Sequence, residues 1–388
     1  MMRTDFARAG HVMCVRTAVL LTLTVAASRA AAQDRFAQTN LVSDVPGLAV
    51  HLDPQLQNPW GISFGAASPF WVSDNGTGVA TLYNGNGIKQ GLVVSIPGPA
   101  GGGAGVPTGQ VFNNTGSFAL SNGTNASFIF ASESGTISGW NGAAGTTAIT
   151  MFDGSTSGAS YKGLAIAGSG TSARLFGANF GSGHIDVFDG SFAPVTTSGG
   201  FVDPSLPAGY APFNVQNIGG SLIVTYALKN PTTGDDVAGP GHGFVDVYDV
   251  NGTLLRRLAS DGVLDSPWGL AMAPLGFGAF GGDLLIGNFG DGTIHAFDIN
   301  TGALDGQLND LAGAPIVNDG LWGLAFGNAG AGFHSDVLYF TAGIDDEQHG
   351  LFGSLSAVPE PGTLGLFGTG LVALLVAATR RRRPPREH

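Results

Sequence analysis

The feature that most constrains the fold of this chain is a unit of about fifty residues that recurs six times between residues 58 and 355. The clearest copy, residues 266–310, has four apolar segments, with Gly-Asp-Gly and Asn-Thr-Gly turns between the later ones. Short apolar segments joined by glycine-containing turns are typical of β-hairpins. Each unit is therefore predicted to form four antiparallel strands, and six such units predict an all-β, six-bladed β-propeller.

The first predicted strand of each unit starts with a similar short sequence. The six sequences are NPWGIS (58–63), PTGQVF (107–112), YKGLAI (161–166), APFNVQ (211–216), SPWGLA (266–271) and GLWGLA (320–325). The third strand of most units ends in an aromatic residue followed by Asn or Asp, as in Phe297-Asp298. This order of glycine, aliphatic strand and Phe-Asp ending resembles the NHL repeat, which implies NHL-like blades.

The sixth unit lacks a fourth strand of its own. Strands are predicted near Trp322–Phe326, Val337–Thr341 and Gly350–Leu355, and none follows them. The N-terminal segment NLVSDV (40–45) resembles RLASDG (257–262), which precedes the SPWGLA strand in the same way. We therefore expect the N-terminal segment to supply the outer strand of the last blade, which closes the ring and leaves no open sheet edge there.

The N-terminal residues have the pattern of a targeting segment. Arginines at positions 3, 8 and 16, the apolar run Ala18–Ala27 and the small residues Ala30–Ala32 predict a cleaved signal peptide over residues 1–32. The propeller domain is then expected over residues 33–355. The chain's one cysteine, Cys14, lies in the leader, so the exported chain is expected to hold no disulfide.

The C-terminal segment, residues 356–388, combines three features in order. A proline-rich motif comes first, the uncharged apolar run Thr363–Thr379 follows, and four arginines come last. The motif and cluster residues are Val358, Pro359, Glu360, Pro361, Arg380, Arg381, Arg382 and Arg383. The apolar run is just long enough for a single transmembrane helix, with the arginines on the cytoplasmic side. An ordinary tail anchor with a proline-rich hinge is one interpretation.

The same order resembles the PEP-CTERM sorting signal. That resemblance implies recognition by an exosortase-type enzyme in a Gram-negative bacterium, often one that makes exopolysaccharide. The protein is then expected in the periplasm or cell envelope, anchored in the membrane before processing and extracellular in some cases afterwards. Residues 40–355 also resemble a family of exported propellers of uncharacterised function, through NLVSDVPGLA, NPWGIS, FVDVYD, SPWGLA, GNFGDG and YFTAGIDDEQHGLFG. This second resemblance implies no known activity.

The charge balance excludes some partners. Residues 33–358 carry seven basic and 25 acidic residues, a net charge of −18. Such a surface repels nucleic acid and anionic lipid and attracts cations. We therefore expect no nucleic-acid partner.

Two long turns carry the residues most able to bind a ligand. The turn between the second and third strands is short in four units but long in the fourth, GDDVAGPGHG (234–243), and in the sixth, GIDDEQHG (343–350). The candidate residues are Asp235, Asp236, His242, Asp345, Asp346, Glu347 and His349. Carboxylate and imidazole groups suit a divalent cation such as calcium, or a polar ligand. The alternative is a pair of solvated turns in which aspartates bond their own backbone.

Two further patterns have a possible chemical role. Trp60, Trp268 and Trp322 each precede a glycine at the start of an inner strand, where they could stack on sugars or act as packing wedges between blades. The stretch GISFG around Ser63 matches a nucleophile motif, but that motif needs a strand–turn–helix and this stretch starts a strand. No catalytic residue is assigned.

The favoured function is therefore an exported envelope or extracellular-matrix propeller that acts as a binding or structural module. An exosortase-type enzyme, the membrane and an exopolysaccharide or other surface component are its expected partners. The alternative is a metal-dependent hydrolase, similar to the lactonases built on six-bladed propellers. The lack of a convincing catalytic constellation favours the non-enzymatic interpretation.

Overall fold

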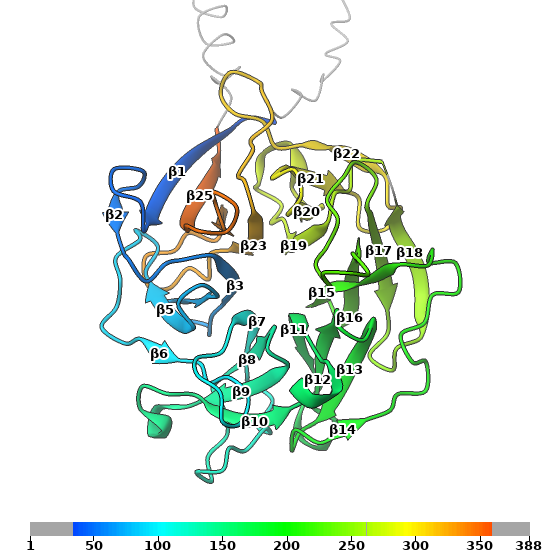
Figure 1. Ribbon diagram of the computed structural model, residues 1–388. Helices are drawn as coiled ribbons and strands as arrows, with labels where there is room; N and C mark the ends of the chain where they lie inside the picture. The colour runs from blue at the N-terminus through cyan, green and yellow to red at the C-terminus, as the bar shows by residue number, and fades with distance from the viewer. Residues whose placement is uncertain (1–33, 261, 359–388) are drawn as a thin grey trace, which may run out of the picture. The chain divides into compact units, whose positions relative to one another are not determined.

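The structure, a computed structural model, describes residues 34–260 and 262–358. Here the strands form six sheets arranged around a common centre, with β3, β7, β11, β15, β19 and β23 innermost (Figure 1). The six-bladed, all-β propeller with four-stranded blades predicted from the repeat is confirmed. The resemblance of the blades to NHL repeats stays a prediction.

The first three blades follow the chain from the innermost to the outermost strand. Blade 1 contains β3 (Pro59–Ser63), β4 (Phe70–Asp74), β5 (Val79–Tyr83) and β6 (Val94–Ser95). Blade 2 contains β7 (Pro107–Phe112), β8 (Phe128–Ser132), β9 (Thr136–Trp140) and β10 (Ile149–Asp153). Blade 3 contains β11 (Tyr161–Ala167), β12 (Arg174–Asn179), β13 (His184–Asp189) and β14 (Pro194–Val195).

The next two blades repeat this order, and the last one recruits the start of the chain. Blade 4 contains β15 (Tyr210–Ile218), β16 (Ser221–Leu228), β17 (Gly243–Tyr248) and β18 (Leu254–Ser260). Blade 5 contains β19 (Pro267–Met272), β20 (Leu284–Asn288), β21 (Ile294–Phe297) and β22 (Leu304–Gln307). Blade 6 contains β23 (Leu321–Phe326), β24 (Val337–Ala342), β25 (Leu351–Ala357), β1 (Phe36–Ser43) and the short β2 (His51–Leu52). The helical segments among the described residues are 3₁₀ turns at Gly142–Ala144, Ser155–Ser157, Gly170–Ser172 and Gly278–Phe280.

The N-terminal strand closes the ring as predicted. β1 pairs antiparallel with β25, from Phe36 opposite Ala357 to Ser43 opposite Leu351, with one irregularity after Asn40. The strand begins a few residues earlier than the predicted segment 40–45. It is the fourth strand of blade 6, and β2 adds two residues beyond it in parallel.

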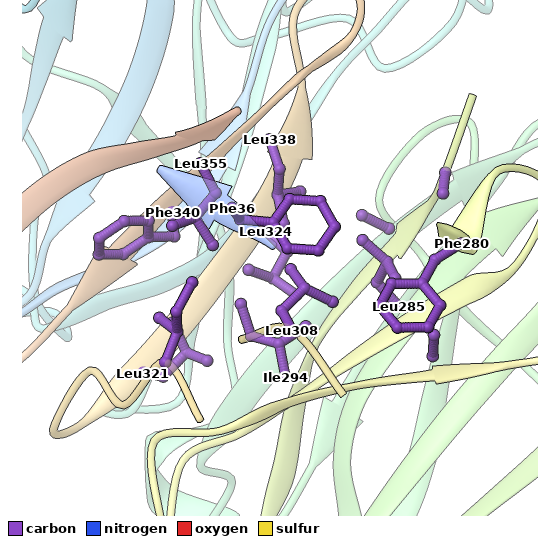
Figure 2. Close-up of a cluster of buried hydrophobic side chains, with 14 of the residues drawn as sticks. Phe36, Phe280, Leu285, Ile294, Leu308, Leu321, Leu324, Leu338, Phe340 and Leu355 are labelled. Carbon is purple, nitrogen blue, oxygen red and sulfur yellow. The ribbon is translucent and has the colours of Figure 1, made fainter. Parts of the chain in front are cut away.

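The hydrophobic core lies between neighbouring blades, because each sheet buries both faces. Figure 2 shows one such cluster, between blades 5 and 6, in which Phe36 of β1 is surrounded by side chains of both blades. Phe36 is fully buried and its ring centroid lies 4.7 Å from that of Phe277. Closure of the ring therefore contributes apolar packing as well as strand hydrogen bonds.

Several predicted features lie outside the described residues. The signal peptide over 1–32, Pro359–Pro361, the transmembrane helix over 363–379 and the arginine cluster over 380–383 belong to this group, and the domain boundaries stay predictions with them. Within residues 34–260 and 262–358, no helix has the length and apolar character needed to cross a membrane.

Candidate functional site

The repeat position that holds tryptophan in three units contributes one side chain from each inner strand to a layer across the centre of the propeller. These six residues are Trp60, Thr108, Lys162, Phe213, Trp268 and Trp322. The rings of Trp60 and Trp322 stack with centroids 3.4 Å apart, and Trp268 meets both of them edge-on at 6.0 and 5.7 Å. All three are at least 96 % buried. Because the three rings are buried, we interpret them as packing residues between blades and not as an open surface on which sugars stack. We call these three residues the tryptophan layer.

A cavity of about 380 Å³ lies along the inner strands on one side of the tryptophan layer. All six inner strands contribute to its wall, and Trp268 is among the residues that line it. The lining residues are apolar or neutral polar, including Phe64, Phe112 and Gln216, and none of them is charged. Because the chain as a whole is strongly acidic, a wall without charged side chains distinguishes the cavity from the rest of the protein.

Two of the cavity amides join neighbouring strands. Gln110 Nε2 donates to Gly61 O and Trp71 O at 2.7 and 2.9 Å, and its Oε1 accepts from Ser63 Oγ at 3.1 Å. Asn214 Nδ2 donates to Trp268 O at 2.6 Å. Ser63 is thus a strand residue bonded to a neighbouring blade, and not a nucleophile on a strand–turn–helix.

Two other polar groups of residues that line the cavity have no hydrogen-bond partner in the described part of the chain. The indole Nε1 of Trp268 is buried without a hydrogen-bond partner in the described part of the chain. Gln216 lies half-buried at the same wall, and its amide group makes none of the side-chain hydrogen bonds found among the described residues. A buried donor without a partner costs stability unless water or a ligand accepts from it.

The turns that follow the second strands lie on the other side of the tryptophan layer. Pro59 pairs with Asp74 and Ser63 with Trp71, so the chain beyond Asp74 emerges at the tryptophan end of β3. The same antiparallel geometry holds in the other blades. The residue directly after the second strand therefore lies around this end in each of blades 1 to 5. These residues are Asn75, Glu133, Phe180, Lys229 and Phe289.

Four charged side chains interact electrostatically at this end of the propeller. Lys162 Nζ forms an ion pair with Glu133, and it lies 5.0 Å from the ring centroid of Trp60 and 5.8 Å from that of Phe180. The Lys162 side chain is only 8 % exposed. The charges of Glu133, Lys162 and Asp236 all act on the carboxyl group of Glu347. We call Glu133, Lys162, Asp236 and Glu347 the charged mouth.

Glu347 is held in the charged mouth by a bond to Asn58 and by an unusual backbone. Asn58 Nδ2 donates to Glu347 Oε2 at 2.6 Å, while Asn58 Oδ1 accepts from Trp322 Nε1 at 3.1 Å. Asp345, Asp346 and Glu347 have φ values of 56°, 52° and 64°, three successive left-handed residues without glycine. Burial raises the pKa of Glu347, and the nearby carboxylates raise it further, while the Asn58 bond and Lys162 oppose the shift.

Asp236 reaches the charged mouth from the long turn of blade 4. Its Oδ2 is buried beside the buried hydroxyl oxygen of Ser266, which is its neighbouring polar group. Burial raises the pKa of Asp236, and the neighbouring Ser266 hydroxyl and Lys162 ammonium act in the opposite direction. Lys229 forms no ion pair with this carboxylate in the described part of the chain, and its Nζ donates to Phe180 O and Gly181 O at 2.8 and 2.7 Å.

The other five predicted loop residues do not join this cluster. Asp235, Asp345 and Asp346 are exposed. His242 Nδ1 bonds Val237 O of its own turn at 2.9 Å, and His349 Nδ1 pairs with Asp44 Oδ2 at 2.8 Å. Across residues 34–260 and 262–358, no group of three or more His, Cys, Asp or Glu side chains is placed to hold a metal ion. The seven residues are therefore divided between two inward carboxylates and a set of turn and anchoring residues.

Sequence reasoning missed three residues of this end: Asn58, Glu133 and Lys162. Lys162 occupies the repeat position that holds tryptophan in units one, five and six. Glu133 directly follows the second strand of blade 2, at the position where blade 3 has Phe180. A comparison of the six units position by position shows both substitutions. The partnership of Asn58 with Glu347 has no such signal, because it joins residues 289 positions apart.

Comparisons with known proteins agree with the fold and with the sorting signal. Residues 357–383 match the family model of the PEP-CTERM protein-sorting motif. This motif implies an exported, cell-envelope-associated protein that is processed by an exosortase-type system. A solved structure of a glucose dehydrogenase superposes with a TM-score of 0.50 at 14 % identity, covering 83 % of this chain and all of that chain, which shows the propeller fold alone.

Two relatives extend over most of the propeller. The uncharacterized protein R648 of Acanthamoeba polyphaga mimivirus is 35 % identical over 329 residues, which cover 81 % of this chain and 78 % of the relative. The uncharacterized protein L690 of the same virus is 36 % identical over 329 residues, 81 % of this chain and 84 % of the relative. With this identity over this length, the chain belongs to the same propeller family as the two mimivirus proteins, and it carries a PEP-CTERM sorting motif at its C-terminal end.

Proposed function

We propose that this protein is a binding module of the cell envelope or extracellular matrix, which takes an uncharged hydroxylated ligand into its central cavity. The observation that carries the proposal is the cavity of about 380 Å³ whose wall comes from all six inner strands and carries no charged side chain. Ligand sites of proteins usually have volumes of about 300–1,000 Å³. A saccharide unit of an exopolysaccharide or another surface component is the ligand we infer.

The chemistry of the wall supports this class of ligand. Hydroxyl groups both donate and accept hydrogen bonds, so they suit the amide of Gln216 at the wall. The rings of Phe64 and Phe112 add apolar faces against which a sugar ring can pack. A charged ligand would lose its hydration in this cavity without gaining an opposite charge.

The alternative of a metal-dependent hydrolase finds less support. Catalytic zinc sites commonly use three protein ligands and leave one position open. The described residues offer no group of that size built from His, Cys, Asp or Glu. The cavity wall also contains no ionisable side chain that could act as a general acid or base.

Binding measurements on the full chain, produced in a host that contains the exosortase, test the proposal. We expect neutral disaccharides to bind measurably by calorimetry, and the corresponding uronic acids to bind at least about tenfold more weakly, because the wall offers them no positive charge. Gln216→Leu keeps the size of the side chain but removes its amide, and should weaken disaccharide binding. Gln348→Leu, at an exposed position away from the cavity, is the matched control. Equal binding of neutral and acidic sugars, or no effect of Gln216→Leu, would contradict the proposal.

A further inference from the structure

We propose that the central cavity is a blind pocket, which takes the free end of a neutral glycan chain and not a segment within the chain. This inference rests on the saccharide function proposed above, and it specifies which part of a saccharide enters. It follows from how the cavity is closed on one side, where it is open, and how its opposite walls differ.

The tryptophan layer closes the cavity on one side. Each inner strand contributes one side chain at this level, and none of the six side chains belongs to a residue that is more than 6 % exposed. Side chains that line an open channel would be exposed to the water inside it. The rings fill the centre, because Trp322 stacks on both Trp60 and Phe289, with centroids 3.4 and 4.0 Å apart. The channel of the propeller is therefore blocked at this level.

The backbones of the inner strands leave no gap beside these rings. Glycine follows the tryptophan position in five of the six units. A Cβ atom at Gly61 would lie 2.6 Å from Thr108 O, and one at Gly269 would lie 2.7 Å from Trp322 O. Neighbouring strands are thus in close backbone contact where the rings meet. A polymer does not pass here unless the blades separate.

The buried ion pair of Lys162 and Glu133 is a further obstacle to threading. Lys162 comes from the same level of the ring, and its side chain is only 8 % exposed. A glycan that ran through the centre would have to displace this side chain and leave a buried charge without its partner, which is costly. The structure therefore favours a ligand that stops at the tryptophan layer.

The cavity opens at the other ends of the inner strands. Along β15, Val215 is buried, Gln216 is half-buried and Asn217 is exposed. Asn114, which lines the cavity just beyond β7, is exposed as well. Because exposure of the wall increases away from the tryptophan layer, we place the entrance at this end. A pocket with this entrance and a closed floor holds the end of a chain, while the rest of the chain extends into solvent.

The opposite walls differ in polarity, which orients the ligand. β3 and β15 lie across the centre from each other (Figure 1). The aromatic part of the wall comes from Phe64, directly after β3, and from Phe112 of β7, whereas β15 contributes the amide of Gln216. A pyranose ring has apolar C–H faces and hydroxyl groups around its rim. It can therefore pack on the aromatic wall and bond to the amide opposite.

Calorimetry of the full chain with maltose, maltohexaose and α-cyclodextrin tests how the ligand enters. Maltohexaose and α-cyclodextrin contain the same glucose units in the same linkage, but α-cyclodextrin is a closed ring without a chain end. We expect maltose and maltohexaose to bind within about threefold of each other, because units outside the pocket make few contacts, and α-cyclodextrin to bind at least about tenfold more weakly. Maltohexaitol, which has a reduced end, tells which end enters: unchanged binding assigns the non-reducing end, and weaker binding assigns the reducing end.

A matched pair of substitutions places binding in the cavity. Ile166→Trp narrows the pocket at its half-buried wall and should weaken maltose and maltohexaose binding alike, by about tenfold or more. Ile88→Trp makes the same change at a side chain that is 50 % exposed and outside the cavity wall, and it should leave binding within about twofold.

Hydroxyl-radical labelling read by peptide mass spectrometry tests the closed floor without any ligand. We expect Trp60, Trp268 and Trp322 to be oxidised much more slowly than Trp140, which is half-buried on β9. The inference is wrong if these tryptophans react as fast as Trp140, if α-cyclodextrin binds as tightly as maltohexaose, or if the two isoleucine variants behave alike. Failure of the saccharide function looks different: no linear sugar binds although the tryptophans stay protected, which would overturn the glycan ligand and leave the blind pocket standing.

Discussion

At the scale of single residues, the entry into three inner strands explains how the tryptophans reach the centre. The residue two positions before each tryptophan has a left-handed backbone: φ is 44° at Asn58, 45° at Ser266 and 62° at Gly320. Glycine adopts this conformation at little cost, whereas asparagine and serine do so less readily. Asn58 has a role that glycine could not fill, because its side chain joins Trp322 to Glu347.

The glycine after each tryptophan permits close contact between neighbouring inner strands. A Cβ atom at Gly323 would lie 2.6 Å from Trp60 O, a backbone atom that cannot move away cheaply. We therefore expect Gly323→Ala to lower the free energy of unfolding by about 1–3 kcal/mol in urea titrations. Gly276→Ala is the control, because a Cβ there meets nothing within 4 Å. Equal stabilities of the two variants would contradict this account of the contact.

A histidine on the blade 6 turn provides a prediction about pH. The hydrogen bond to Asp44 and its charge raise the pKa of His349 above 6.5. The stabilisation is complete below the pKa of the unfolded chain, near 6.5, and is lost as the pH rises through the higher folded value. In NMR titrations we expect Asp44→Asn to lower the pKa of His349 towards 6.5, and Asp346→Asn to leave it nearly unchanged. A His349 pKa that does not respond to Asp44→Asn would show that the pair does not form in solution.

At the scale of elements, the decisive feature is the pairing of the first strand with the last. β1 brings strand hydrogen bonds to β25 and the fully buried Phe36 to the core between blades 5 and 6 (Figure 2). Residues from the two ends of the propeller domain therefore stabilise one blade together. Neither end can complete this blade alone.

Two variants measure how much this closure contributes. Deletion of residues 33–45 removes β1 and should sharply lower the melting temperature and cause aggregation, because it exposes sheet edges. Phe36→Ala removes only the apolar contact and should cost about 3–5 kcal/mol in denaturant unfolding. Val50→Ala, at a side chain that is 66 % exposed, is the control and should cost little. Near-wild-type stability of the truncated chain would rule out closure by β1.

At the scale of the whole molecule, the propeller presents different chemistry at the two sides of the tryptophan layer. The cavity side is uncharged, while the mouth gathers charges from blades 2, 3, 4 and 6. The sorting motif follows directly after the last strand: β25 ends at Ala357, and Val358 N donates to Arg35 O at 3.0 Å. Processing at the motif can therefore leave every strand of the propeller in place.

Sorting is the prediction that belongs to this scale. Changing Pro359, Glu360 and Pro361 to alanine should leave the protein in the membrane fraction of an exosortase-containing host, because the processing enzyme loses its motif while the apolar run 363–379 remains. The unchanged protein should lose its C-terminal segment in the same host, as seen by fractionation and intact mass. Identical fractionation and mass of the two forms would show that the motif is not processed there.

The sequence by itself determined the number of blades, the closing strand and the sorting signal. These properties depend on local patterns: apolar segments of strand length, glycine turns, a repeat of about fifty residues and an uncharged run before arginines. The lengths of the two unusual turns were also visible. They marked seven candidate residues, of which the structure turns Asp236 and Glu347 inwards and leaves the other five in exposed or anchoring positions.

Only the tertiary structure decided which of these side chains meet. Glu133, Lys162, Asp236 and Glu347 come from four blades, and they share one site because the ring brings the same end of every blade to one face. The left-handed backbone of the blade 6 turn sends Glu347 inwards and leaves Asp345 and Asp346 exposed. Side-chain direction in a turn depends on backbone angles that its neighbours enforce across the ring, and a local sequence pattern does not contain that information.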